Sequence, residues 1–178
     1  MLKSRLCIAF FAFAVGCAPA QKPLTDYVNP MLGTATLWDS VDLGFKPTKR
    51  TWGAEVFPGS SLPNAMVQVS PVTKFHSGAG YQYEDSVIYG FTHTNKGHWN
   101  LCHIPLLPVT GTPTPGDYCS PFSHERESAA PGYYQVFLDR YGVDAQLSST
   151  LRCAFHKYTY PAGAAASLLA GLQRSNEH

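Results

Sequence analysis

Hydrophobic and polar residues alternate most regularly in the last third of the chain. In residues 134–138 the odd and even positions differ in polarity, and the same period of two returns in residues 143–147. Alternation of this kind is typical of strands that bury one face. The intervening Arg140-Tyr141-Gly142 has the character of a turn. We therefore predict an antiparallel hairpin over residues 134–147.

Shorter runs with the same period predict further strands. They lie at residues 66–69, 87–91, 104–109, 151–158 and 167–172. Pro105 and Pro108 make the third run an edge strand or a bent one. In the fourth run Leu151, Cys153 and Phe155 take the apolar phase, against Arg152, His156 and Tyr158. No convincing apolar stripe with a helical period follows residue 20, so parallel βαβ folds are disfavoured and an antiparallel β-sandwich is expected.

The first 20 residues predict an export signal rather than part of the fold. Lys3 and Arg5 precede an apolar stretch at residues 6–15, which is too short to span a bilayer. Residues 14–17 resemble a bacterial lipobox, which would place a diacylglycerol on Cys17. The alternative is ordinary cleavage after residues 18–20, which read Ala-Pro-Ala. The protein is expected in the periplasm, on the outer membrane or secreted, with membrane contact only through a lipid anchor.

Composition narrows the function further. The formal net charge is +1 and 14% of residues are charged, without a basic run, so a nucleic-acid partner is not expected. Of five cysteines, three remain once Cys7 is removed and Cys17 is lipidated or lost. An odd number cannot close a disulfide framework, so the fold must depend on its hydrophobic core.

Two segments are candidates for binding. Periodicity fails over residues 31–59, and long loops inside compact domains are often functional. Trp38 and Trp52 in this loop could stack on a sugar ring or could cover the core edge. Residues 121–134, PFSHERESAAPGYY, concentrate polar and aromatic residues before a strand. Three histidines spaced by five residues, at positions 93, 98 and 103, do not share a helix or strand face, so a transition-metal site is disfavoured.

Five separated blocks resemble glycoside hydrolase family 92, in the family's order. They are YVNPMLGT at residues 27–34, FPGSSLPNAMVQVSP at 57–71, SGAGYQYEDSVIYGFTHT at 77–94, PFSHERESAAPGYY at 121–134 and LDRYGVDAQLSSTLRCAFHKYTYP at 138–161. The family comprises calcium-dependent, exo-acting α-mannosidases. The resemblance is to its N-terminal domain, an antiparallel β-sandwich of the galactose-mutarotase-like supersandwich type. It implies that residues 21–178 form this all-β domain, incomplete at its C-terminal end.

The resemblance implies that catalysis is divided between two domains. The general acid, the general base and the ligands of Ca²⁺ belong to a C-terminal helical barrel that this chain does not contain. No catalytic or metal-binding residue is therefore expected here, and the expected partners are a mannose-containing glycan and the protein's own helical domain. The sandwich would supply a wall of the pocket. Motif by motif, the candidates for substrate binding are Gly33, Thr34, His76, His93, His124 and Glu125.

Several alternatives stay open at this point. Residues 57–59, Phe-Pro-Gly, would shape the pocket wall by backbone approach, and His124 with Glu125 could instead be a structural pair that holds the turn before Tyr133. His76 lies where many members carry a Trp-containing segment, so its contact with substrate is a hypothesis about linkage preference. The function expected is the substrate-pocket domain of an exported, inverting α-mannosidase acting on α-1,2 or related linkages of N-glycans or mannans. The alternative is a non-catalytic carbohydrate-binding module or an inactive fragment.

Overall fold

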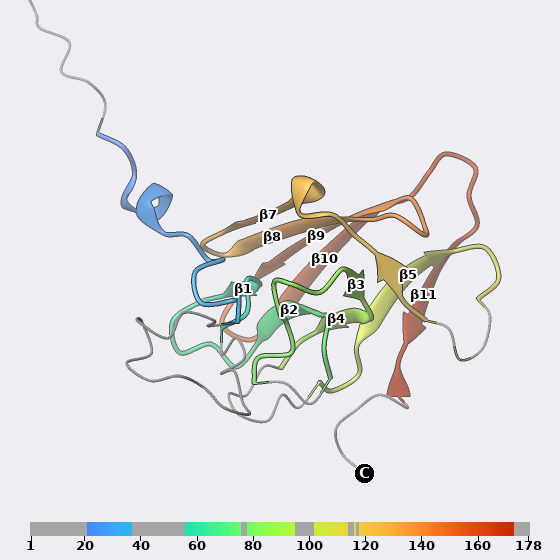
Figure 1. Cartoon of the computed structure of the whole chain (residues 1–178), viewed down its shortest axis with the longest axis horizontal. Coiled ribbons are helices and arrows are strands. Elements are labelled where there is room, and N and C mark those ends of the chain that lie inside the picture. Colours follow the sequence, from blue (N-terminus) through green and yellow to red (C-terminus); the bar gives the residue numbers. More distant parts are fainter. Residues whose placement is uncertain are drawn as a thin grey trace, which may run out of the picture.

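A computed structural model shows two antiparallel sheets packed face to face (Figure 1). It describes residues 21–36, 56–75, 78–94, 102–113, 116 and 118–172. The first sheet has the order β1-β2-β4-β5-β11, with strands Ser60–Ser61, Gln68–Val72, Gly90–Thr92, Leu106–Thr110 and Ala166–Ala170. The second has the order β10-β9-β8-β7, with strands Ala154–Thr159, Val143–Ser149, Tyr133–Leu138 and Glu127–Ala130. The prediction of an all-β antiparallel sandwich is confirmed.

Three smaller elements complete the described part of the chain. Strands β3 (Val87–Ile88) and β6 (Ser120–Pro121) form a two-stranded sheet. Single 3-10 turns form η1 (Leu24–Tyr27), ahead of the sandwich, and η2 (His124–Arg126), directly before β7. Among these residues no helix is long and apolar enough to cross a bilayer.

The predicted hairpin is present as β8 and β9. Leu138 pairs with Val143, and the strands stay in register as far as Tyr133 and Ser148. Gly142 ends the turn with φ of +64°, a conformation in which a residue with a Cβ is strained. Gly132, at the turn between β7 and β8, has a similar φ of +76°. Each of these two turns therefore requires the conformational freedom of glycine.

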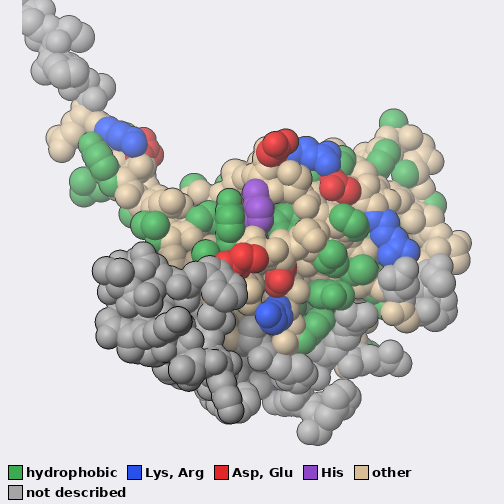
Figure 2. Space-filling model, viewed as in Figure 1, with side chains coloured by type: hydrophobic (Ala, Val, Ile, Leu, Met, Phe, Trp, Pro, Cys, Tyr) green, Lys and Arg blue, Asp and Glu red, His purple; other side chains and the backbone are tan. Residues whose placement is uncertain are grey.

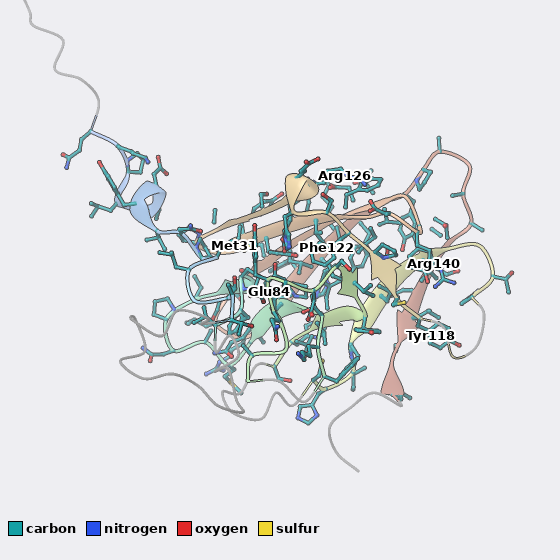
Figure 3. The ribbon with its side chains drawn as sticks, in the orientation of Figure 1. Met31, Glu84, Tyr118, Phe122, Arg126 and Arg140 are labelled. Atoms are coloured by element: carbon teal, nitrogen blue, oxygen red, sulfur yellow. The ribbon has the colours of Figure 1, made fainter. Side chains whose placement is uncertain are left out.

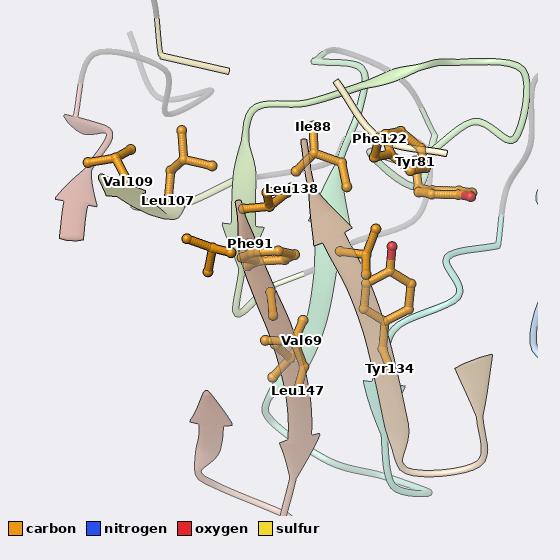
Figure 4. Packing of buried hydrophobic residues seen from close by; sticks show 13 residues of the cluster. Val69, Tyr81, Ile88, Phe91, Leu107, Val109, Phe122, Tyr134, Leu138 and Leu147 are labelled. Atoms are coloured by element: carbon orange, nitrogen blue, oxygen red, sulfur yellow. The ribbon is translucent and has the colours of Figure 1, made fainter. Parts of the chain in front are cut away.

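The core lies between the two sheets, where both contribute alternate side chains. In Figure 4 Phe91 of β4 lies between Leu138 and Leu147 of the opposite sheet, and Val69 lies beside Leu147. The remaining members of the cluster are Tyr81, Ile88, Leu107, Val109, Phe122, Tyr134, Val136, Val143 and Ala145. Cys102, Cys119 and Cys153 are free thiols, so in the described residues the two sheets are held by packing.

Two strand predictions differ from the structure. Strand β5 is not at an edge, because it lies between β4 and β11. It nevertheless pairs with β4 only at Leu106, so Pro108 does not interrupt a continuous ladder on that side.

Strand β10 has the opposite phase to the one predicted. Phe155 points outward and is 60% exposed, whereas Ala154 and Tyr158 pack against the core. Tyr158 stacks on Phe91, with ring centroids 6.2 Å apart. Each face of β10 carries an aromatic residue, Phe155 on one and Tyr158 on the other. Contact with Phe91 determines that Tyr158 turns inward.

Glycine also brings the first two strands together. A Cβ added to Gly59, just before β1, would lie 1.8 Å from the carbonyl oxygen of Val69 in β2. The Phe-Pro-Gly segment at residues 57–59 therefore makes a close backbone approach, and its partner is the neighbouring strand. The predictions for residues 1–20, Cys17, Trp38, Trp52, His76 and His98 concern residues outside the described ranges.

Candidate functional site: a polar network beneath an exposed aromatic ring

The site is built around a buried carboxylate, Glu127, at the start of β7. Only 1% of its side chain is exposed. Tyr81 donates from its hydroxyl to both carboxylate oxygens at 3.0 Å, and the Tyr134 hydroxyl donates to Oε1 at 2.6 Å. His124 Nδ1 lies 2.5 Å from Oε2. A buried charge is costly unless it is hydrogen-bonded, and these contacts satisfy both oxygens of the carboxylate.

The local sequence explains how His124 reaches Glu127. Phe122 is buried and anchors the segment, and the Ser123 hydroxyl accepts a hydrogen bond from the backbone N–H of Glu125. The turn η2 that follows is a 3-10 turn, in which residues three apart lie on the same side. His124 and Glu127 are three residues apart, so η2 places them in contact.

His124 is a link between the buried network and the surface. Its Nε2 lies 2.7 Å from the carbonyl oxygen of Tyr83, and its ring stacks on the Tyr83 ring with centroids 4.0 Å apart and planes 9° apart. Both ring nitrogens of His124 therefore lie within hydrogen-bond distance of an oxygen atom. The structural role considered for His124 is the one the geometry favours, with Glu127 rather than Glu125 as its partner.

Tyr83 is the exposed end of this chain of contacts. Its side chain is 40% exposed, and its backbone N–H donates to the carbonyl oxygen of Thr34 at 2.9 Å. Thr34 is fully buried, and its own hydroxyl donates to the Met31 carbonyl oxygen at 2.8 Å. Gly33 precedes it with φ of +84°, and a Cβ there would meet Val56 at 3.0 Å. The structure thus brings Gly33, Thr34 and His124 together through Tyr83.

Two acidic residues, Glu84 and Asp85, directly follow Tyr83 in the sequence. We call Tyr83 and these two residues the rim. Glu84 accepts from the backbone N–H of Thr36 at 2.8 Å and lies between Met31 and Phe122 in the view of Figure 3. Burial by itself would raise the pKa of Glu84, but hydrogen bonds from the backbone and from the Thr36 side chain outweigh it, so this pKa lies below its ordinary value. Asp85 accepts from the Thr73 hydroxyl at 2.8 Å. In Figure 2 this face carries acidic side chains below an exposed histidine.

The two buried tyrosines remain hydrogen-bond donors. Burial raises the pKa of both Tyr81 and Tyr134 above the ordinary range, and the neighbouring negative charge of Glu127 raises each pKa further. A phenol whose pKa is raised in this way stays protonated at neutral pH and can donate. The network therefore acts as a support for the rim rather than as a proton donor to a substrate.

His93 belongs to a different cluster. Its Nε2 lies 2.8 Å from His156 Nε2 in β10, and His156 Nδ1 lies 2.6 Å from the Tyr158 hydroxyl. Burial lowers the pKa of His93. Burial, and then the charge of His93, lower the pKa of His156 to about 4. No contact joins this pair to His124 within the described residues, so the structure does not bring His93 and His124 into one site.

Glu125 lies on the surface beside the network. Its side chain is exposed and lines a polar hollow with Arg126, Ser128, Gln135, Phe137 and Asp144. Arg126 forms an ion pair with Asp139 and lies over the Phe137 ring at 4.2 Å. His76 lies outside the described residues. Within them, no group of three His, Cys, Asp or Glu side chains could hold a metal ion.

Sequence reasoning did not identify Tyr81 or Tyr83, and it named Glu127 only as a possible acid/base carboxylate, without its contact with His124. A signal was available for Glu127, because the spacing of three from His124 fits one tight turn. The alternation in GYQYE would place Tyr81 and Tyr83 on the same side of an extended segment, so it does not predict that Tyr81 is buried and Tyr83 exposed. Their partners, however, lie 41 and 46 positions away along the chain, and no local pattern reveals such contacts.

Comparison with solved structures places this sandwich among domains of mannosidases. The family GH92 α-mannosidase BT3965 from Bacteroides thetaiotaomicron, in complex with mannoimidazole, gives a TM-score of 0.71 and 30% identity over 86% of this chain and 20% of that one. The inverting mannosidase BT2199 from the same organism gives 0.65 and 26% over 84% and 20%. The GH92 family glycosyl hydrolase ccman5 gives 0.58 and 33% over 67% and 18%. The chain spans about a fifth of the length of these enzymes.

The sequence itself matches a family model. The glycosyl hydrolase family 92 N-terminal domain covers residues 27–178. The chain therefore belongs to glycosyl hydrolase family 92, as the five sequence blocks predicted. Among proteins with curated functions, none matches it.

Proposed function

We propose that this chain is the substrate-pocket domain of an exported, exo-acting α-mannosidase that inverts configuration. Membership of the family over residues 27–178 carries the proposal. In this assignment residues 1–20 are a signal peptide and residues 21–178 the N-terminal sandwich. The helical part of the same protein supplies the acid, the base and the Ca²⁺ site, and the substrate is an α-1,2 or related mannoside of N-glycans or mannans.

Tyr83 is the residue proposed to meet the sugar. The C–H face of a pyranose packs well against an aromatic ring, and the Tyr83 ring combines 40% exposure with a fixed orientation. The His124 ring stacks on one face of the Tyr83 ring. Hydrogen bonds of the Tyr83 backbone to His124 and to Thr34 hold its main chain in place. A ring held before binding loses little entropy on contact. The family resemblance implied that Gly33, Thr34 and His124 line the pocket wall. In this proposal these residues support Tyr83, and the Tyr83 ring contacts the sugar.

The chain's own carboxylates do not provide the catalytic pair in this proposal. Inversion uses an acid and a base about 6.5–9.5 Å apart on opposite sides of the sugar. Glu127 is buried beneath three donors, and Glu84 is held by the backbone of Thr36. Glu125 remains a candidate for sugar contact. His93 remains a candidate for substrate binding and His76 a candidate for linkage preference, and His76→Ala assayed on a panel of mannobioses tests the role of His76.

The experiment that tests the function uses the protein with its helical domain. Release of mannose from α-1,2-mannobiose is expected, and Tyr83→Ala should lower kcat/KM about 10- to 100-fold through the loss of one aromatic contact. Tyr27→Ala is the matched control, because Tyr27 is an exposed aromatic on η1, away from the network. An enzyme that releases no mannose would refute the proposal. Equal activity of the two variants would refute the role of Tyr83.

The export route is part of the same proposal. Lipid on Cys17 would anchor the protein, whereas cleavage after residue 20 would release it. Metabolic labelling with a radioactive fatty acid tests this, and Cys17→Ala should abolish the label. An unlabelled wild-type protein in the soluble periplasmic or secreted fraction would support ordinary cleavage instead.

A further inference from the structure

The outward face of the second sheet is unusual for a solvated surface. Register places Tyr133, Gln135 and Phe137 of β8 directly beside Ser148, Gln146 and Asp144 of β9. The next strand, β10, adds Phe155 beside Ser148, and 60% of this ring is exposed. The inward residues of β8 and β9 are the core itself. This outer face therefore combines aromatic rings with amides and hydroxyls, and with the long charged side chain of Lys157, which the β10 register places beside Gln146.

The polar groups on this face are already ordered. Gln135 and Gln146 each donate from Nε2 to the Asp144 carboxylate, at 2.8 Å and 2.7 Å. The Tyr133 hydroxyl donates to Gln135 Oε1 at 2.9 Å. Each amide nitrogen has a second N–H, and Gln146 has its own oxygen, so donors and acceptors alternate along the face. Groups fixed before binding give an incoming ligand hydrogen bonds at reduced entropic cost.

The charges of this face select the class of ligand. Arg126 is paired with Asp139 and covers Phe137, and the Asp144 carboxylate is bound by the two glutamines. Figure 2 shows acidic and basic side chains side by side at the upper edge, at the place of η2 in Figure 1. The exposed Lys157 of β10, beside Gln146, and the Asp144 carboxylate carry opposite charges, so among these residues neither an anion nor a cation finds a large surplus of opposite charge. A hollow of about 320 Å³ beside Gln135 and Asp144 provides a recess on the same face.

We propose that the outer face of β7 to β10, with Gln135, Asp144, Gln146 and Phe155 at its centre, is a second, non-catalytic binding surface for neutral polysaccharide. Planar amides offer paired hydrogen bonds to adjacent hydroxyls, and the exposed Phe155 ring offers a platform for a sugar face. The choice of mannan as ligand rests on the proposed function. Such a surface holds a polymer near the pocket and raises the effective concentration of chain ends.

The test is affinity electrophoresis of the whole protein in native gels containing yeast α-mannan, with saturating mannoimidazole to occupy the active site. Wild type should be retarded. Gln135→Ala with Gln146→Ala, and separately Phe155→Ala, should weaken mannan affinity about 5- to 20-fold, while hydrolysis of mannobiose stays within twofold. Tyr27→Ala is the matched control, because Tyr27 is an exposed aromatic on η1, outside this face.

The outcomes separate this inference from the proposed function. Retardation that mannoimidazole abolishes, or that both variants retain, overturns the second surface even if the enzyme is active. Retardation that persists in a protein releasing no mannose upholds the surface and refutes the catalytic proposal. If the double variant fails to fold, Phe155→Ala decides, because an exposed ring can be removed without opening the core. A variant that loses thermal stability only when the helical domain is present would show that this face is an interdomain contact, which also overturns the proposal.

Discussion

At the scale of single residues, Glu127 is the most consequential side chain of the described structure. It accepts from two buried phenols and contacts His124, which in turn holds Tyr83. Removing a buried acceptor leaves its donors without partners, and the cost exceeds the net value of the bonds that are lost. Stability and the position of the Tyr83 ring therefore depend on the same carboxylate.

Glu127→Ala should lower the free energy of unfolding by about 3–5 kcal/mol. Glu127→Gln should cost less than half as much, because its amide nitrogen can donate to a neutral His124 while its oxygen still accepts from Tyr81 and Tyr134. Urea denaturation measures both. Glu125→Ala, two residues away and exposed, is the control and should stay within about 0.5 kcal/mol of wild type. Equal costs for the Ala and Gln variants would contradict the proposed bonding.

The His93 and His156 pair predicts a dependence of stability on pH. The folded-state pKa of His156, about 4, lies below its unfolded value near 6.5, so the unfolded chain binds more protons between these two values. This contribution is complete above pH 6.5 and is lost as the pH falls toward 4.

His156→Gln should therefore reduce the loss of stability between pH 7 and pH 4 by roughly 1–2 kcal/mol, a value discounted for the partial exposure of the ring. Urea denaturation at several pH values measures it. Tyr158→Phe, which keeps both histidines, should leave most of the dependence in place. A His156→Gln variant with the slope of wild type would show that this pair is not the origin.

At the scale of elements, the β8–β9 hairpin shows what sequence alone could predict. Its period of two, with a turn at residues 140–142, determined both strands and their register. The phase of β10 could not be predicted the same way, because Phe155 and Tyr158 are both aromatic and the choice depends on Phe91 in the other sheet. In the candidate site, too, local contacts could be predicted and long-range contacts could not. His124 was found from its local motif, whereas Glu127 gains its role from the distant Tyr81.

The two hairpin glycines give a matched test of turn strain. Gly132→Ala places a Cβ in open space. It should lower the free energy of unfolding only by the cost of holding alanine in a left-handed backbone conformation, about 1–2 kcal/mol. Gly142→Ala also brings its Cβ within 3.1 Å of Pro161, and we expect about 1 kcal/mol more. Thermal denaturation of the two variants compares them directly. Equal shifts in Tm would mean that the Pro161 ring yields without cost.

At the scale of the whole molecule, apolar surface gathers around β5 and β11. Leu168 and Leu172 are 51% and 68% exposed. Beside them Tyr89, Leu107, Tyr118 and Leu169 line an apolar groove of about 370 Å³. Exposed apolar area of this kind promotes association. The described sandwich is therefore well packed between its two sheets, and part of its outer surface is apolar enough to promote association.

Residues 21–178 expressed alone should consequently be poorly soluble. Leu168→Ser with Leu172→Ser should raise the soluble fraction severalfold, because both changes remove apolar surface without touching the core. Centrifugation followed by gel quantification measures this, and Leu24→Ser on η1 controls for a general effect of polarity. A wild-type domain that is monomeric in sedimentation and melts cooperatively would contradict the expectation.

The chain of contacts from Glu127 through His124 to Tyr83 has an evolutionary consequence. Under the proposed function, selection for a folded protein and selection for sugar binding at Tyr83 act there on one carboxylate, so neither property can drift independently of the other. A change of substrate preference is then more accessible through Glu125 and the acidic side chains of the rim, Glu84 and Asp85, which can vary while the buried network remains intact.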